Sequence, residues 1–276
     1  MNNNLYVIKV SGEKELFSKE KYLRSLKRCG CSPEVIDSLL KEVVSNFEDG
    51  ISTREIYSRT WTFLKNRSCA CFAARYNLKQ SLLKLGPSGY PFEHFVKSLF
   101  QKRGYKVKSQ QIVKGRCIDY EIDVIAFNDK ERILIECKFH NNQEYRSDAK
   151  TALYVKARLD DINQYYKQHD PLNIFTKCLI ITNTKFTTNA ISYGECVGME
   201  MVSWGYPQNE NLENLIAKYH LHPISCLHSL SDKDLSILLN LGIILCEDLH
   251  LNKDKLKNIG IAKKKLDLFM NECASL

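Results

Sequence analysis

Two neighbouring apolar segments that carry charged residues constrain the fold of this chain more than any other feature. Residues 117–127 read CIDYEIDVIAF, residues 132–140 read RILIECKFH, and the polar residues 128–131 join them. Alternation within each segment predicts the two strands of a hairpin. Because side chains two positions apart share one face of a strand, Glu136 and Lys138 are expected on the same face. Burying such charges costs several kcal/mol unless they pair or bind a metal.

The charged groups of this hairpin suit hydrolysis assisted by a metal ion. Asp123 and Glu136 come from adjacent strands, and two converging carboxylates suit a hard cation such as Mg²⁺ or Mn²⁺. Such an ion polarises a phosphate and lowers the pKa of a bound water, while the Lys138 ammonium stabilises developing negative charge. The alternative is a buried salt-bridge network of the same three residues without catalysis.

Helix-breaking residues divide the chain into three blocks, at 1–86, 87–206 and 207–276. The second block has, in order, a predicted helix at 91–103, strands at 105–113, 118–127 and 132–139, a helix at 149–167, a strand at 177–182, a helix at 187–197 and a strand at 200–204. This order predicts a mixed α/β sheet flanked by helices. The third block is helical, so we expect a multidomain α and α/β protein.

The first block predicts two short strands around a turn at Gly12, followed by a helical bundle. The predicted helix N-caps are Ser18, Ser32 and Thr53. A fourth helix is predicted over about residues 69–85.

Residues 89–204 resemble the PD-(D/E)xK endonuclease superfamily, specifically its Mrr-like branch. The resemblance rests on Phe92-Glu93 at a helix start, Glu121-Ile122-Asp123, Glu136-Cys137-Lys138 and the helix that follows. It implies a restriction-endonuclease-like fold in which Asp123 and Glu136 hold the metal and Lys138 aids the nucleophilic water. It further implies metal contacts from the backbone carbonyl of Cys137 and from Glu93. Some members place a polar residue on the following helix, which here would be Gln164, Lys156 or Arg158.

The first block resembles the ATP-cone, a nucleotide-sensing module with a short β-sheet lid on a helical bundle. The matching residues are Val7, Lys9, Gly12, Glu15, Phe17-Ser18, Lys21, Gly50-Ile51-Ser52-Thr53, Tyr57 and Ala73-Ala74-Arg75-Tyr76. The resemblance implies ATP or dATP as a bound effector, with Lys9 and Lys21 on its phosphates. Val7, Glu15, Ser18, Thr53 and Tyr57 would line the rest of the site. The alternative is a degenerate cone retained as a scaffold.

The tail near residues 256–263 resembles the hairpin of a helix-hairpin-helix DNA-binding motif. There, Gly260 would let backbone N–H groups approach a phosphate, and Lys263 and Lys264 would add positive charge. Residues 238–243 resemble a second, weaker hairpin. The alternative is a small helical bundle with a solvated lysine face.

Composition adds limits on location and partners. The formal charge of +8 favours a polyanionic partner, and the apolar runs are too short to cross a bilayer. Eleven scattered cysteines indicate reduced thiols in a cytoplasmic protein with no membrane partner. The close pairs Cys29/Cys31 and Cys69/Cys71 are expected to be buried structural thiols.

Together, the three blocks lead to a specific functional hypothesis. We expect a Mg- or Mn-dependent endonuclease that hydrolyses DNA, forms a homo-oligomer and is regulated by ATP or dATP. One alternative is a nucleotide-responsive DNA-binding regulator with an inactive nuclease fold. Another is a protein that acts on ribonucleotide reductase through its cone.

Overall fold

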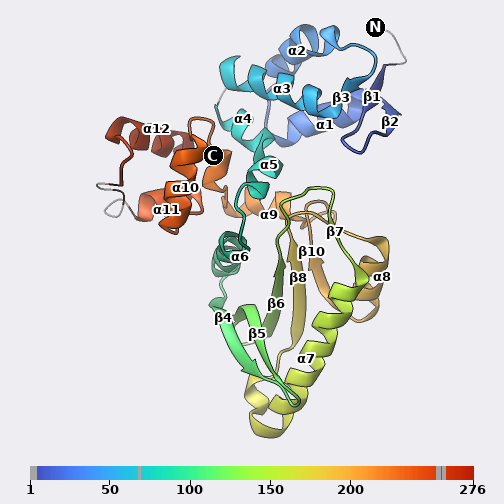
Figure 1. Cartoon of the computed structure of the whole chain (residues 1–276), viewed down its shortest axis with the longest axis vertical. Coiled ribbons are helices and arrows are strands. Elements are labelled where there is room, and N and C mark those ends of the chain that lie inside the picture. Colours follow the sequence, from blue (N-terminus) through green and yellow to red (C-terminus); the bar gives the residue numbers. More distant parts are fainter. Residues whose placement is uncertain (1–4, 68–69, 253–255, 257–258) are drawn as a thin grey trace. The chain divides into compact units, whose positions relative to one another are not determined.

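The computed structural model describes residues 5–67, 70–252, 256 and 259–276 (Figure 1). Contacts divide the chain into two compact units. The first comprises residues 1–78, 226–230 and 262–276, and the second comprises 79–225 and 231–261. The block at 207–276 thus contributes residues to both units.

The first unit contains a sheet of three short strands in the order β2-β1-β3. The central strand β1 (Tyr6–Ile8) pairs antiparallel with β2 (Lys14–Leu16) and parallel with β3 (Ile51–Ser52). Gly12 turns the chain between β1 and β2 with a φ of +84°, a conformation that favours glycine. The hairpin was predicted, whereas β3 was not, because two residues carry no periodicity.

The helices of the first unit are α1 (Lys19–Arg28), α2 (Pro33–Glu42), α3 (Thr53–Arg67), α4 (Ala70–Tyr76) and α12 (Lys263–Ala274), with a 3-10 turn η1 (Val44–Asn46). Ser18 and Ser32 cap α1 and α2, as predicted. The predicted cap at Thr53 was wrong. The hydroxyl of Ser52 accepts the N–H of Glu55 at 3.0 Å, and Thr53 already belongs to the helix.

The single helix predicted over residues 69–85 was also wrong. Among the described residues, the helix is interrupted at Asn77, between α4 and α5 (Leu78–Leu83). The side-chain oxygen of Asn77 accepts a hydrogen bond from the hydroxyl of Tyr57. Asn has a low helix propensity because its short polar side chain favours caps and turns, and the apolar periodicity of the segment does not register a single such residue.

The second unit is built on a five-stranded sheet in the order β10-β8-β6-β5-β4. Its strands are β4 (Lys106–Lys114), β5 (Asp119–Phe127), β6 (Arg132–Lys138), β8 (Lys177–Thr182) and β10 (Glu200–Val202). The pairs β4–β5 and β5–β6 are antiparallel, and β6–β8 and β8–β10 are parallel. The mixed sheet was predicted. A short parallel pair, β7 (Arg146–Ser147) with β9 (Lys185–Phe186), was not.

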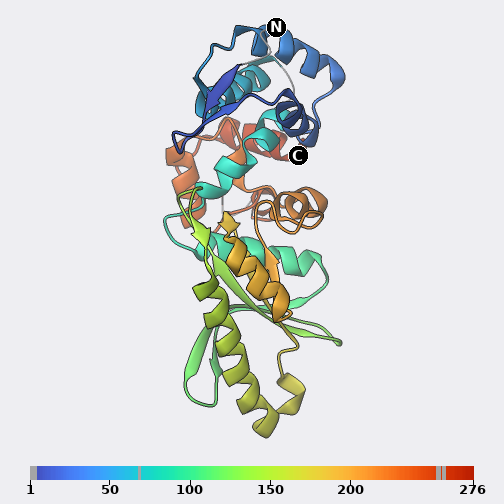
Figure 2. The same cartoon turned by 90° about the vertical axis from the view of Figure 1, so that its right-hand side faces the viewer.

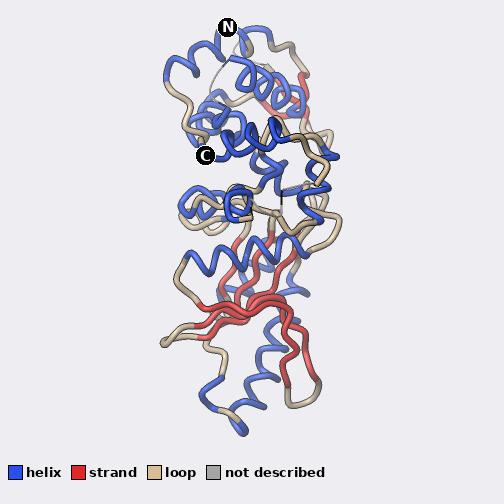
Figure 3. The backbone as a smooth tube through the Cα atoms, turned by 90° about the vertical axis from the view of Figure 1, so that its left-hand side faces the viewer, coloured by secondary structure: helices blue, strands red, loops and turns tan. Residues whose placement is uncertain are grey.

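Helices lie on both sides of this sheet (Figures 2 and 3). Those against the sheet are α6 (Tyr90–Lys102), α7 (Ala149–His169) and α8 (Thr188–Cys196). The unit also contains α9 (Leu212–Tyr219), α10 (Asp232–Asn240) and α11 (Cys246–Leu251), with 3-10 turns η2 (Pro171–Asn173) and η3 (Ile224–Cys226). The apolar side of α7, with Val155 and Ile162, packs on Ile122 and Leu134 in one buried cluster. This packing holds α7 over the strands that carry the charged residues.

Two expectations from composition can be compared with the structure. No helix among the described residues is long and apolar enough to span a membrane. Ten cysteines lie within the described residues and all are free thiols. Cys29, Cys31 and Cys71 are buried, as predicted, whereas Cys69 lies outside the described residues.

Candidate active site

Glu136 on β6 is a buried carboxylate with a cation on each oxygen. Its side chain is only 5% exposed. The ammonium of Lys138 lies 2.5 Å from Oε1, and a guanidinium nitrogen of Arg158 lies 2.5 Å from Oε2. Arg158 comes from α7 and also donates to the backbone carbonyl of Glu121 at 2.9 Å. The predicted pair of Glu136 and Lys138 is therefore part of a three-residue network.

Asp123 reaches the same network from β5. The pairing of β5 with β6 runs up to Val124 opposite Ile135, so Asp123 and Glu136 hold the next two positions. Oδ2 of Asp123 accepts the backbone N–H of Cys137 at 2.7 Å. Burial, and then the charge of Glu136, raise the pKa of Asp123 to about 6. A bound cation would relieve this strain between two carboxylates.

Glu93 approaches the cluster from the first turn of α6. Burial raises the pKa of Glu93, and the charges of Glu121 and Glu136 raise it further. Its carboxylate accepts a hydrogen bond from the side chain of Gln110 at 3.3 Å. This contact from β4 was not predicted from the sequence.

Gln110 also has an unusual backbone, with a φ of +51°. Its neighbours Ser109 and Gln111 pair with Val124 and Ile122, so Gln110 occupies the position across from Asp123. A non-glycine residue in the left-handed region is uncommon, and such residues concentrate at functional sites.

The three polar residues considered on the following helix have different partners. Gln164 accepts a hydrogen bond from Arg116 at 2.9 Å, and Lys156 pairs with Asp160 on its own helix. Only Arg158 contacts the acidic cluster. In the sequence, Arg158 can be recognised as a cation on the apolar face of α7, between Val155 and Leu159.

The site offers a magnesium-type ion two carboxylates and no larger donor group among the described residues. Within the residues that the structure describes, no three His, Cys, Asp or Glu side chains form a group that could hold a metal. Mg²⁺ is usually held by one or two carboxylates and keeps several waters, so Asp123 and Glu136 meet its needs. The metal contacts predicted for Glu93 and for the carbonyl of Cys137 stay predictions.

In the first unit, the structure joins three of the predicted nucleotide residues. Glu15 lies 2.9 Å from the ammonium of Lys9 and 3.8 Å from that of Lys21. Lys9 also pairs with Glu13 at 2.9 Å. Val7 is buried next to them, paired with Glu15 across the hairpin. These exposed ion pairs place two ammonium groups beside one carboxylate, where a polyphosphate could replace it.

The other predicted nucleotide residues take part in helix ends and helix packing. Ser18 accepts the N–H of Lys21 at 3.2 Å. Thr53 begins α3 directly after Ser52, whose Cα partner in the sheet is Ile8. Tyr57 stacks on Tyr76 of α4, with ring centroids 5.3 Å apart.

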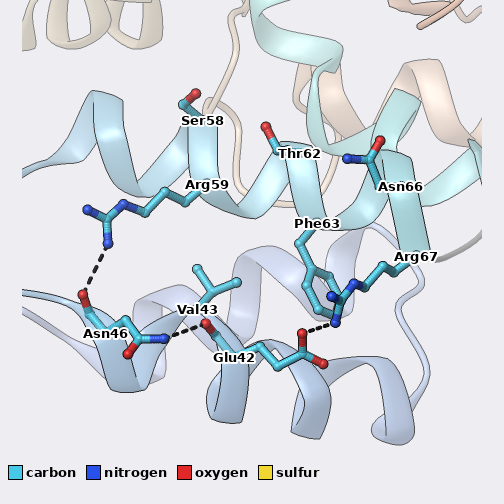
Figure 4. A pocket seen from close by; sticks show the side chains of 9 residues that line it. All are labelled: Glu42, Val43, Asn46, Ser58, Arg59, Thr62, Phe63, Asn66 and Arg67. Atoms are coloured by element: carbon cyan, nitrogen blue, oxygen red, sulfur yellow. Dashed lines mark hydrogen bonds and ion pairs between the residues drawn. The ribbon is translucent and has the colours of Figure 1, made fainter.

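A separate pocket of about 480 Å³ lies in the first unit, between α2, η1 and α3 (Figure 4). Its lining differs from the predicted nucleotide residues. Two arginines lie on its walls, each already engaged: Arg59 with Glu55 and Arg67 with Glu42. The aromatic ring of Phe63 lies beside the guanidinium of Arg67.

The tail residues predicted to contact DNA are exposed. Gly260 has a φ of +80°, and Lys263 and Lys264 open α12. Directly after the weaker hairpin of residues 238–243, the N–H groups of Ile244 and Leu245 bond to Asp248. DNA contact by this tail stays a prediction.

Three family models match the chain. They are the ATP cone domain over residues 5–78, a restriction endonuclease model of the Mrr type over residues 86–203, and the AF1548-like C-terminal domain over residues 222–276. The chain therefore combines the two domain types inferred from its sequence. The match over residues 222–276 further points to a particular group of relatives.

An uncharacterized protein of Archaeoglobus fulgidus is 38% identical over 169 residues, which are 60% of this chain and 91% of that protein. The crystal structure of a protein of unknown function, AF1548, aligns with a TM-score of 0.55 and 36% identity over 68% of this chain and 97% of that one. The chain belongs to the AF1548-like family. A repair endonuclease from Pyrococcus abyssi aligns at 12% identity over 42% of this chain and 46% of that one, with a TM-score of 0.30.

Proposed function

We propose that the second unit is a metal-dependent endonuclease that hydrolyses DNA phosphodiester bonds. The observation that carries this proposal is the meeting of Asp123 and Glu136, on adjacent strands, with the ammonium of Lys138 beside them. When bound, Mg²⁺ or Mn²⁺ would polarise the phosphate and activate a water. Asp123 and Glu136 would hold the ion, and Glu93 and the carbonyl of Cys137 would complete its surroundings.

Lys138 has the properties that such a reaction needs from a point charge. Its side chain is 34% exposed, so the ammonium can leave Glu136 and approach a phosphate. There it would stabilise negative charge in the transition state and orient the attacking water. The resting ion pair with Glu136 holds this group close to the site.

We further propose that ATP or dATP binds beside Lys9 and Lys21 and regulates cleavage, with a change in oligomeric state as the means. Gly260, Lys263 and Lys264 would add contacts to DNA phosphates. The support is the ATP cone match together with the exposed cations of the first unit. Light scattering with and without each nucleotide measures the change in mass.

The direct test is cleavage of plasmid, branched and single-stranded DNA with Mg²⁺ or Mn²⁺, each with ATP or dATP titrated. We expect Lys138→Ala to reduce the cleavage rate by about a hundredfold or more. Lys156→Ala is the matched control, because Lys156 pairs with Asp160 on the helix surface. Equal cleavage by Lys138→Ala and the wild type would refute the catalytic proposal. Tight DNA binding without cleavage under any metal would favour a regulator with an inactive nuclease fold.

A further inference from the structure

The two cations on Glu136 are held very differently. Arg158 is 4% exposed, donates to Glu136 and to the carbonyl of Glu121, and lies 4.7 Å from the ring centroid of Tyr154. Lys138 has a flexible stem and is 34% exposed. A cation that approaches Glu136 would therefore displace Lys138 and leave Arg158 in place.

Burial explains why Arg158 stays. A buried charge that loses its counter-ion is strongly disfavoured, whereas a half-exposed ammonium can be solvated by water. The Nε of Arg158 is buried and has no hydrogen-bond partner among the described residues. Loss of the contact with Glu136 would add a second unsatisfied donor to this guanidinium.

We propose that Arg158 is a positioning residue that permanently occupies Oε2 of Glu136. The metal can then use only Oε1, the oxygen that Lys138 holds at rest. A metal ion would therefore bind Oε1 only as Lys138 leaves it, so the two events are coupled. The lysine is thus freed for the phosphate only when the ion is in place. This inference rests on the proposed nuclease function.

The positive charge of Arg158 has a measurable consequence for metal affinity. A neutral partner that orients a ligand usually strengthens metal binding, and its loss weakens binding. Arg158 also repels a divalent ion, and with Lys138 it neutralises the acidic cluster. We expect the repulsion to outweigh the orientation, so that the metal-free site is stable and its intrinsic affinity for divalent cations is low.

The experiment measures Mn²⁺ binding to the full chain by electron paramagnetic resonance, at about pH 8, without DNA. We expect Arg158→Met to bind Mn²⁺ at least about fivefold more tightly than the wild type, and Arg158→Lys to remain within about twofold. Lys138→Met, which removes the competitor for Oε1, should also bind at least about fivefold more tightly. Lys156→Met on the same helix is the control and should match the wild type.

Each outcome decides the inference. Weaker or unchanged Mn²⁺ binding by a folded Arg158→Met protein means that Arg158 only orients or packs, and overturns it. If circular dichroism shows that Arg158→Met does not fold, Lys138→Met decides, and unchanged affinity there overturns the exchange. Absence of Mn²⁺ binding by the wild type and both variants, together with no cleavage of DNA at any metal concentration, would instead refute the proposed nuclease. If the wild type cleaves DNA but neither variant binds Mn²⁺ more tightly, only the exchange of Lys138 for the metal at Glu136 is refuted.

Discussion

Each unit contains a glutamate flanked by two cations, and the two sites differ mainly in burial. In the first unit, Glu15 lies between Lys9 and Lys21, and the three side chains are 33%, 35% and 72% exposed. In the second unit, Glu136 lies between Lys138 and Arg158, and both Glu136 and Arg158 are about 5% exposed. The same combination of charges therefore exists in two different dielectric environments.

Burial determines what each combination can do. Exposed ion pairs are worth about 0–1 kcal/mol, so a polyphosphate can open the Glu15 network at small cost. Removal of one partner from a buried pair costs about 3–5 kcal/mol, so the Glu136 network keeps its geometry until another cation replaces one already present. The exposed site suits reversible sensing, and the buried site suits fixed positioning.

The largest expected effect comes from neutralising the buried glutamate. Glu136→Gln should destabilise the second unit by about 3–5 kcal/mol, because Arg158 stays buried without a counter-ion. The two tryptophans allow each unit to be followed separately, since Trp61 belongs to the first unit and Trp204 to the second. In a Trp61→Phe background, the fluorescence of Trp204 during urea unfolding measures the effect.

The matched comparison is Glu15→Gln in a Trp204→Phe background, followed by Trp61. Similar losses of stability in the two units would contradict the role given to burial. A loss below about 1 kcal/mol for Glu136→Gln would show that Arg158 finds other partners or water.

The sequence predicted much of the buried site because its residues follow simple periodicity. Glu136 and Lys138 alternate with apolar residues on one strand, and Asp123 lies on the strand across the turn. The family resemblance alone did not single out Arg158 from Gln164 and Lys156, although Arg158 lies on the apolar face of α7. Helical periodicity shows which face is buried, but the residue that reaches a given strand depends on how α7 packs across the sheet.

Other features depend on contacts between distant residues. The left-handed backbone of Gln110 has no signal in a strand-like sequence. The hydrogen bond between Tyr57 and Asn77, the residue at the helix break, joins positions twenty residues apart. β3 forms because β1 offers a free edge, and neither strand alone predicts the pairing.

A third carboxylate separates the effect of burial from that of a cation. Asp248 is 9% exposed and accepts the N–H groups of Ile244 and Leu245 at 2.9 and 2.8 Å. Its pKa is lowered: burial alone would raise it, but hydrogen bonds from His94, Leu245 and Ile244 outweigh burial. We expect Asp248→Asn to destabilise the second unit by about 2 kcal/mol at neutral pH.

The pH dependence of this loss has a definite sign. A carboxyl with a lowered pKa in the folded state contributes stability above its unfolded pKa and loses it as the pH falls through the folded value. The difference between the wild type and Asp248→Asn should therefore shrink as the pH falls below about 4. Asp232→Asn is the control, because Asp232 is 90% exposed in its pair with Lys84. A gap that widens in acid would rule out this role for Asp248.

In the exposed network, removal of a cation should affect ligand binding more than stability. We expect Lys9→Met and Lys21→Met each to weaken ATP binding by about tenfold, or about 1.4 kcal/mol, by removing a charge from the phosphates. Isothermal titration calorimetry at low and high salt tests this, since the loss should be smaller at high salt. Lys14→Met is the control, because Lys14 pairs with Asp49 at 3.9 Å. Full ATP affinity in both variants would place the nucleotide elsewhere, with the pocket of Figure 4 as the next site to test.

The smallest effect is expected for the exposed glutamate itself. Lys9 lowers the pKa of Glu15, so Glu15 is ionised at neutral pH and competes with phosphate for both lysines. Glu15→Gln should change stability by less than about 1 kcal/mol and should bind ATP as tightly as the wild type or up to about threefold more tightly. Titration calorimetry on the two proteins measures this. A large loss of ATP affinity would mean that Glu15 contacts the nucleotide directly. The exposed network would then hold a fixed geometry for its ligand, as the buried network does, and burial would not separate the two sites.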